Sequence, residues 1–173
     1  MVTQADSATF FEGDEWGQVL RAYARPGVAS ACLLLQEELG VDVVVLLHLA
    51  YVQEVRGAVV TEDAVARADA AVKPWRDAVV RPLRGARRAI GKDAEALKPL
   101  RAGIQKMELL AERQAFALLA AAPACKQTPG AAAPANAVQQ VAAFYATAAG
   151  AADRLGRADV RQAIACLSKG LFG

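Results

Sequence analysis

The sequence predicts an all-α protein, a compact bundle of six to eight helices in a single domain. Its 173 residues are a suitable length for one domain. Hydrophobic residues make up 55% of the chain and aromatic residues only 6%, so Ala, Val and Leu supply most of the apolar content. Ala and Leu favour helix, and the alternation of Val, Thr and Tyr that marks a β-sandwich is missing from the sequence.

The first elements are predicted from apolar spacing and helix-end signals. We expect residues 1–12 to form a loose leader and residues 13–173 to form the domain. Apolar residues three and four apart predict a first helix over about 14–24. Pro26 suits the first turn of a second helix. This helix runs to Leu39, because the next residue is a glycine, a common signal for a helix C-terminus.

The third helix is predicted over about 43–56, with Asp42 as its cap. Its three initial valines favour strand, but the apolar run continues on nearly every side, which is typical of a central, buried helix. Gly57 ends it. Thr61, followed by two acidic residues, predicts the start of a fourth helix that reaches about residue 72.

Pro74 is expected to interrupt the chain before a fifth helix over about 75–91. A sixth and longest helix is predicted over about 94–121, with Pro99 near its beginning, where proline costs little. Prolines and glycines among alanines predict a flexible loop at 122–135. Two sequences that resemble capping boxes, Asn136 with Gln139 and Asp159 with Gln162, predict two last helices over about 137–154 and 160–171.

The densest charge lies on the predicted fifth helix. At 100° per residue, its apolar residues share one face: Val79, Leu83, Ala86 and Ile90. Three arginines lie on the opposite face, and two flank the apolar stripe. The opposite face holds Arg81, Arg84 and Arg88, and the flanking pair is Arg76 and Arg87. The helix is therefore expected to pack with one side and to present guanidinium groups with the other.

Glu108 and Glu112 lie one turn apart on the predicted sixth helix, an arrangement that is mildly unfavourable by itself. Arg84 or Arg88 would neutralise them if the two helices form an antiparallel hairpin around Gly91. Two interpretations follow. The arginines and glutamates form a salt-bridge lattice that sets helix register, or some arginines stay unpaired and bind an acidic partner through their planar guanidinium groups.

Catalytic and metal-binding residues are scarce. His48 is the only histidine, which excludes a di-iron bundle and a zinc site with several histidine ligands. Cys32, Cys125 and Cys166 are odd in number and widely spaced, so they predict neither a disulfide framework nor a metal site. We assign no catalytic residue, metal or cofactor from the sequence. His48 is expected to be a core histidine or, with Tyr51, to line a pocket between helices.

The sequence also indicates in which cellular compartment the protein is expected. No stretch approaches the ~18 uncharged apolar residues that a membrane-spanning helix needs. The N-terminus has no basic region followed by an apolar run, so we predict no secretory signal. These observations predict a cytoplasmic protein that does not enter a membrane.

Three functions are compatible with this pattern. The first is a non-enzymatic interaction or adaptor protein that binds an acidic protein surface through its arginine-rich helix. Homo-oligomerisation through an apolar helix face is also compatible with the sequence. The second is a small-molecule-binding protein or enzyme with an apolar pocket near His48 and Tyr51. The third is weak nucleic-acid binding, against which the net charge of only +2 argues.

Three segments resemble a small proteobacterial family of conserved hypothetical proteins of unknown function. They are Trp16 with LRAYARPGVASACLLLQEELGVDVVVLL (Leu20–Leu47), WRDAVVRPLRGARRAIGK (Trp75–Lys92) and IQKMELLAERQAFALL (Ile104–Leu119). The resemblance implies an all-helical cytoplasmic protein and brings no catalytic residues with it. The chain departs from the family's usual pattern at Val44, where a polar Asn is expected, and at His48, where an apolar residue is expected.

Overall fold

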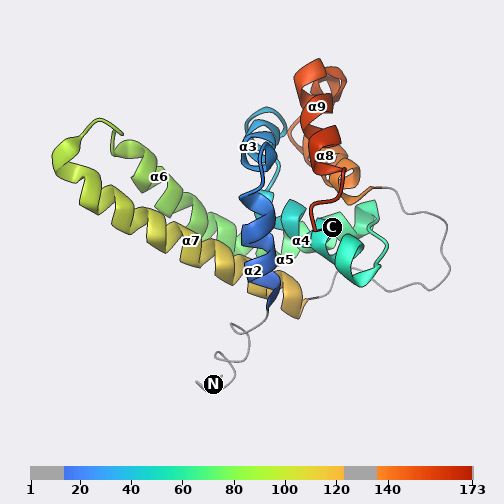
Figure 1. The fold of residues 1–173 in the computed structure, drawn as a ribbon, viewed down its shortest axis with the longest axis horizontal. Helices are drawn as coiled ribbons and strands as arrows, with labels where there is room; N and C mark the ends of the chain where they lie inside the picture. The colour runs from blue at the N-terminus through green and yellow to red at the C-terminus, as the bar shows by residue number, and fades with distance from the viewer. Residues whose placement is uncertain (1–13, 123–135, 173) are drawn as a thin grey trace.

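A buried helix, α4 (Val43–Arg56), lies at the centre of the fold (Figure 1). Every residue from Val45 to Tyr51 is buried. Helices α7 (Lys98–Ala121) and α8 (Ala137–Ala148) pack against it. This confirms the central helix that the apolar sequence predicts, in spite of its β-branched beginning.

The computed structural model describes residues 14–122 and 136–172, and within these residues the chain forms helices and no strand. The predicted all-α bundle is therefore confirmed. The predicted leader, residues 1–12, lies outside the described residues, as does the predicted loop at 122–135 apart from Ala122. The remaining α-helices are α2 (Asp14–Tyr23), α3 (Val28–Leu39), α5 (Glu62–Trp75), α6 (Arg81–Ala89) and α9 (Ala158–Leu167).

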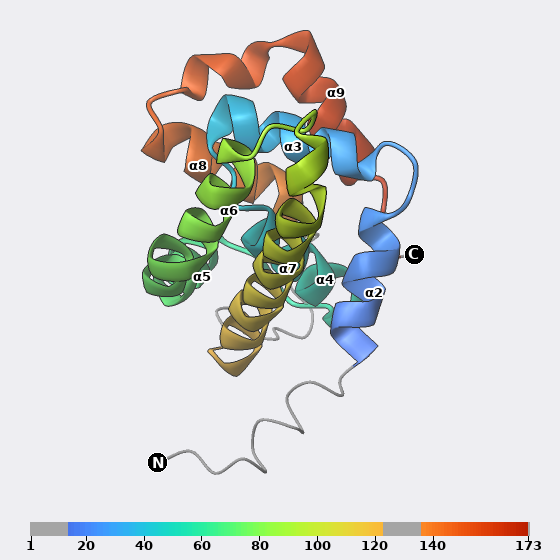
Figure 2. The same cartoon turned by 90° about the vertical axis from the view of Figure 1, so that its left-hand side faces the viewer.

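The helices divide into a packed body and a projecting hairpin. In the body, α3 packs on α9, and α4 packs on α8 and α5. Helices α6 and α7 run side by side, and the turn that joins them projects away from the body (Figures 1 and 2). The hairpin is anchored at its base, where Ala115, Phe116 and Leu119 of α7 enter the core. An indole N–H bond adds a second anchor, from Trp75 Nε1 to the Ala111 carbonyl at 2.8 Å.

Local end signals set several helix boundaries as predicted. Asp42 caps α4, because its Oδ1 accepts hydrogen bonds from the backbone N–H groups of Val44 and Val45. The hydroxyl of Thr61 accepts from the Ala64 N–H and caps α5. Gly40 ends α3 with a φ of 71°, a left-handed conformation that only glycine adopts without strain.

The predicted break at Pro74 is wrong. Helix α5 passes through Pro74 and continues, by way of a π-helical segment over Arg76–Val80, directly into α6. In this segment the Arg81 N–H bonds to the Arg76 carbonyl, five residues back. Pro82 follows at once and has no N–H to donate, so a wider turn here accommodates a proline that would strain a regular helix. The two helices that were predicted on either side of Pro74 therefore form one continuous rod. The π-helical segment in its middle changes the phase of the helix, that is, the direction in which the following side chains point.

Other boundaries also differ from the prediction. Pro26 precedes the helix, which begins at Val28 after Gly27 with a φ of 84°. The longest helix begins at Lys98 after a short 3-10 turn, Glu95–Leu97. Helix α8 ends at Ala148, before a glycine with positive φ, and a 3-10 turn over Ala152–Gly156 leads into α9.

The predicted cap at Asp159 is wrong, because the residue that precedes α9 is Arg157 and Asp159 lies inside the helix. The cap at Asn136 is confirmed, since its Oδ1 accepts from the Val138 N–H at 2.9 Å. Among the described residues, no helix has the length and apolar character needed to cross a membrane.

The buried position of α4 predicts a large effect of truncating its core side chains. Leu49 is completely buried, so Leu49→Ala should lower the free energy of unfolding by about 2–5 kcal/mol through lost burial and a residual cavity. Val55 on the same helix is 45% exposed, and Val55→Ala should change it by less than about 0.5 kcal/mol. Urea unfolding followed by circular dichroism measures both, and equal losses would contradict the central position of α4.

Candidate functional site

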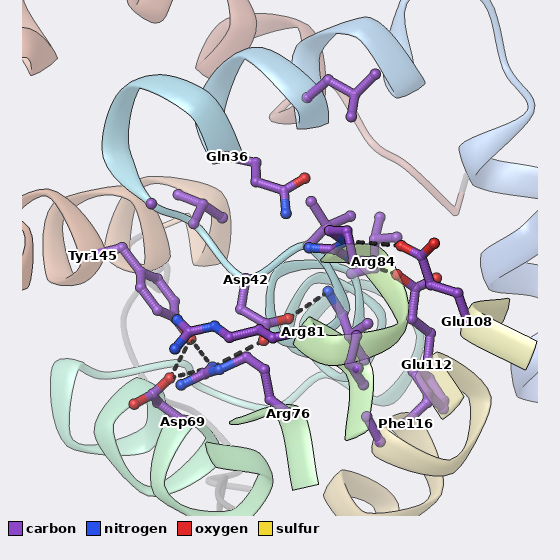
Figure 3. Close-up of a pocket in the computed structure, with 18 of the residues that line it drawn as sticks. Gln36, Asp42, Asp69, Arg76, Arg81, Arg84, Glu108, Glu112, Phe116 and Tyr145 are labelled. Atoms are coloured by element: carbon purple, nitrogen blue, oxygen red, sulfur yellow. Dashed lines mark hydrogen bonds and ion pairs between the residues drawn. The ribbon is translucent and has the colours of Figure 1, made fainter. Parts of the chain in front are cut away.

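A cavity of about 910 Å³ lies between α2 and α3 on one side and the α6–α7 hairpin on the other (Figure 3). Helix α6 contributes four arginines to its lining: Arg81, Arg84, Arg87 and Arg88. We call this cavity, defined by these four arginines and the residues opposite them, the basic groove. Arg76, which precedes α6, also lines the cavity, so the structure brings all five predicted interaction arginines to it.

The wall opposite the arginines is largely apolar. Trp16 and Leu20 of α2 and Leu33 of α3 line it, and Leu47 and Val80 lie among its deeper residues. Leu20 and Leu33 are 39% and 47% exposed, so this wall is open to solvent. Gln36 of α3 adds one polar group, which points into the cavity (Figure 3).

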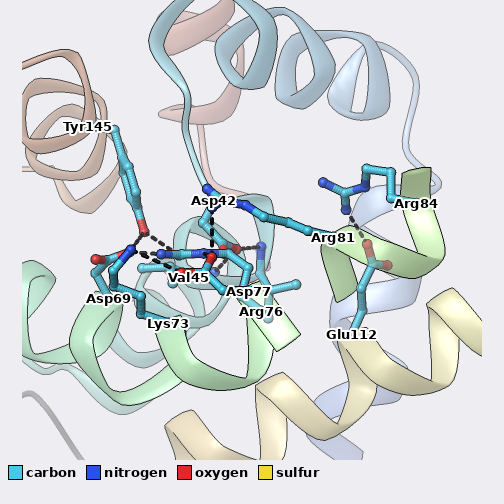
Figure 4. A network of polar contacts seen from close by, with 11 residues as sticks. Asp42, Val45, Asp69, Lys73, Arg76, Asp77, Arg81, Arg84, Glu112 and Tyr145 are labelled. Atoms are coloured by element: carbon cyan, nitrogen blue, oxygen red, sulfur yellow. Dashed lines mark hydrogen bonds and ion pairs between the residues drawn. The ribbon is translucent and has the colours of Figure 1, made fainter. Parts of the chain in front are cut away.

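The inner end of the groove holds a buried ionic cluster around Arg76 (Figure 4). Arg76 Nη1 donates to Asp42 Oδ2 at 2.9 Å and to Asp69 Oδ1 at 2.7 Å. The Tyr145 hydroxyl also donates to Asp69 Oδ1, at 2.6 Å. The side chain of Arg76 is only 12% exposed. Arg76, which was predicted to lie at the border of the arginine face, is therefore a structural ion that joins three segments of the chain.

The pKa shifts in this cluster agree with its geometry. Burial by itself would lower the pKa of Arg76, but the hydrogen bonds to Asp69 and Asp42 raise it above its ordinary value. Burial raises the pKa of the Tyr145 hydroxyl, and the Asp42 and Asp69 carboxylates raise it further. Tyr145 therefore keeps its proton and acts as a donor, and Arg76 keeps its charge.

Asp77 connects this cluster to the open part of the groove. It is exposed, and it pairs with Lys73 at 3.1 Å and with Arg81 at 2.7 Å. The side chain of Arg81 is 62% exposed and extends from α6 back toward the Arg76 cluster (Figures 3 and 4). An exposed pair of this kind contributes little to stability, so Arg81 can exchange Asp77 for another anion at low cost.

A second ionic cluster joins the two helices of the hairpin. Arg84 Nε donates to Glu108 Oε1 at 2.9 Å, and Arg84 Nη2 donates to Glu112 Oε1 at 2.7 Å. Arg87 Nε donates to Glu108 Oε2 at 2.5 Å. Glu108 is buried and accepts from two arginines. The two glutamates thus neutralise part of the arginine face of α6.

The two glutamates differ in their pKa shifts. Burial alone would raise the pKa of Glu108, but the hydrogen bonds from Arg87 and Arg84 lower it below its ordinary value. Burial raises the pKa of Glu112, and Arg84 opposes the shift without cancelling it. The charged form of Glu108 is therefore stabilised by the cluster, whereas the charged form of Glu112 is less favourable than that of an ordinary glutamate.

Arg88 differs from the other arginines of α6. It is exposed, lines the groove, and makes no hydrogen bond or ion pair within residues 14–122 and 136–172. Its guanidinium group is available to a ligand. Arg76, Arg84 and Arg87 therefore form internal ion pairs, as the salt-bridge interpretation expects. Arg81 has only its exposed pair with Asp77, and the binding of an acidic partner by these arginines stays a prediction.

His48 and Tyr51, the predicted pocket residues, do not line the groove. His48 is buried with its ring edge against Phe116, at 5.1 Å between centroids. Burial lowers the pKa of His48 to about 4, so the imidazole is neutral. Tyr51 packs against Phe172 on another side of the core, at 5.2 Å between centroids. Within the described residues, no group of three His, Cys, Asp or Glu side chains could hold a metal ion.

Three residues of the Arg76 cluster were not predicted as site residues from the sequence. Asp69 and Tyr145 had no assigned role, and Asp42 was assigned only as a cap. Asp69 lies seven residues before Arg76, two turns along one rod, and this spacing would have indicated the pair had the helix been predicted to continue through Pro74. Tyr145 gives no comparable signal, because it comes from a helix almost seventy residues away in sequence.

Residues 14–119 match a family whose description is only that of a protein of unknown function, DUF2390. The matched span runs from α2 to nearly the end of α7 and includes both walls of the basic groove. No curated protein and no solved structure matches the chain.

The burial of His48 makes stability depend on pH. The unfolded histidine has a pKa near 6.5 and the folded one about 4, so the unfolded state binds the proton more tightly. Stability should be complete above pH 6.5 and fall by roughly 3 kcal/mol as the pH decreases to about 4. NMR titration of the single imidazole measures its pKa directly. His48→Leu should flatten this part of the stability profile, and an ordinary pKa near 6.5 would contradict the prediction.

Removing the charge of Glu108 should loosen the hairpin. Glu108→Gln leaves Arg84 and Arg87 without their shared carboxylate, so we expect a loss of about 2–3 kcal/mol in the free energy of unfolding. Glu95→Gln is the control, because Glu95 is 78% exposed in its pair with Lys98, and it should cost less than about 0.5 kcal/mol. Urea unfolding measures both. A loss no larger for Glu108→Gln than for the control would show that the buried cluster does not hold α6 on α7.

Proposed function

We propose that this chain, which belongs to the DUF2390 family of unknown function, is a non-enzymatic adaptor that binds an acidic segment of a partner protein in the basic groove. The observation that supports this most directly is the pair Arg81 and Arg88. Both are exposed on the groove wall, Arg88 has no partner among the described residues, and Arg81 has only an exposed one. A guanidinium group binds a carboxylate through two parallel hydrogen bonds, which suits a partner rich in Asp or Glu.

The internal ion pairs support this proposal. Glu108 fixes the guanidinium groups of Arg84 and Arg87 along α6, so the cationic wall is ordered before a ligand arrives. Preorganised groups lose less conformational entropy on binding. The glutamates also reduce the charge of the wall, which favours a selective contact with carboxylates over general attraction to any polyanion.

The same pairs support binding over catalysis. The carboxylates that line the groove are Asp42, Asp69, Glu108 and Glu112, and each is paired with an arginine. A general base needs a carboxylate or imidazole that can take up a proton near neutral pH. Asp42, Asp69 and Glu108 accept hydrogen bonds from half-buried arginines, and Glu112 accepts from Arg84.

The proposal places the protein in the cytoplasm of a proteobacterium. The free thiols of Cys32 and Cys166 support a reducing compartment. The proteobacterial source rests on the sequence resemblance alone.

Charge reversal in the groove should abolish binding of an acidic chain. We expect fluorescent poly-L-glutamate to bind the wild-type protein at low salt, and Arg81→Glu/Arg88→Glu to weaken the Kd at least about tenfold. The matched control is Lys106→Glu/Arg161→Glu, which changes the net charge equally at two exposed sites outside the groove. Its Kd should change less than about threefold. Fluorescence anisotropy measures the binding.

Equal weakening by the two double variants would contradict the proposal, because it would show attraction to overall charge. A single-stranded DNA oligonucleotide of similar charge provides a further comparison. If DNA binds more tightly than poly-L-glutamate and depends on the same arginines, the nucleic-acid alternative is correct instead. Circular dichroism and urea unfolding establish that each variant is folded.

A further inference from the structure

Helix α6 lacks the packing that every other long helix of the structure has. It packs on α7 and continues from the π-helical segment, but none of its own residues is buried. In contrast, α4 and α8 each bury half of their residues. A helix of this kind has one supporting neighbour, and its opposite side faces the groove.

The groove also collects exposed apolar side chains. Leu20, Leu33 and Leu109 are 39%, 47% and 46% exposed, and all three line it. A single exposed leucine is ordinary on a protein surface. Three around one cavity that also holds Arg81 and Arg88 mean that a ligand meets apolar contacts and cations together.

The size of the groove fits a helix. A helix with its side chains is about 10–12 Å wide and rises 5.4 Å per turn, so each turn occupies roughly 500 Å³. The cavity of about 910 Å³ therefore accommodates about two turns. Its two walls are themselves helices, α3 and α6, and helices pack side by side at 8–10 Å through interlocking side chains.

On the basis of the proposed function, we infer that the partner segment is an amphipathic α-helix with an acidic stripe. The acidic stripe faces Arg81, Arg84 and Arg88 of α6, and the apolar stripe faces Leu20 of α2 and Leu33 of α3. Such a helix gives α6 the second neighbour that it lacks. Recognition of an amphipathic helix in a groove uses anchor residues about one turn apart, and Arg81, Arg84 and Arg88 are likewise three and four residues apart on α6.

Glu108 and Glu112 give this site a directional preference. They bind Arg84 from the α7 side, so an incoming carboxylate approaches the guanidinium groups from the α3 side, where Gln36 points into the cavity (Figure 3). A stripe of acids on one side of a helix satisfies this geometry, because residues three and four apart share a face.

The test compares three peptides of about 18 residues, or five turns. The first has Leu on one face and Glu on the other. The second has the same composition in an order that removes the two faces. The third replaces each Glu of the first with Gln. We expect the first to bind at least about tenfold more tightly than either of the others, measured by isothermal titration calorimetry.

Variants of the apolar wall test the orientation. Leu33→Ser should weaken the first peptide at least about tenfold. Leu100→Ser is the matched control, because Leu100 is 56% exposed on α7 and does not line the groove. It should leave the Kd within about threefold. Circular dichroism of the mixture should show that the peptide gains helix on binding.

The outcomes separate the two proposals. If the rearranged peptide binds as tightly as the amphipathic one, and both depend on Arg88, the acidic partner stands and its helical form is wrong. If no peptide depends on Arg88, the proposed function is wrong as well. If sedimentation shows a dimer that Leu33→Ser dissociates, the groove belongs to a second copy of the chain, which overturns the inference.

Discussion

The ion pair between Asp42 and Arg76 is the contact on which the arrangement of the helices depends. One oxygen of Asp42 caps α4, and the other accepts from Arg76 at the start of the π-helical segment. The beginning of the central helix is thereby tied to the point where the α5–α6 rod changes phase. An arginine this deeply placed needs its full set of carboxylate partners, because an unpaired buried charge is strongly destabilising. Asp69 supplies a second carboxylate to Arg76, and the Tyr145 hydroxyl donates to the same oxygen of Asp69.

The phase change at the π-helical segment decides which arginines are exposed. Arg76 is the first residue of this segment and turns into the protein, whereas Arg81 and Arg88 follow the segment and face the groove. π-Helical turns are rare and frequently lie at functional sites. Here the wider turn accommodates Pro82. It also allows one continuous rod to place Arg76 inside the protein and to present the arginines of α6 to the groove.

Local signals predicted much of the fold. Asp42, Thr61 and Gly40 act on atoms within a few residues, so their effects can be read from the sequence. Pro74 was misjudged because a proline by itself indicates a break, whereas the packing of α5 on α7 and α8 is not visible in any local pattern. The burial of Arg76 was missed for the same reason, since its partner Asp42 is 34 residues away. The arginine and glutamate residues of the hairpin were found because their periodicity is helical, but their pairing required the relative position of two helices.

The contrast between the two walls of the groove limits what it can bind. A nucleic acid would meet the cations of α6 but would leave the leucines of α2 and α3 exposed or force them against polar phosphates. A purely apolar ligand would bury the guanidinium group of Arg88 with no partner for its charge, at a large desolvation cost. Only a ligand that has both an acidic and an apolar surface makes favourable contacts with both walls. An amphipathic helix provides this separation of surfaces along its whole length, because its period of 3.6 residues places acids and leucines on opposite faces.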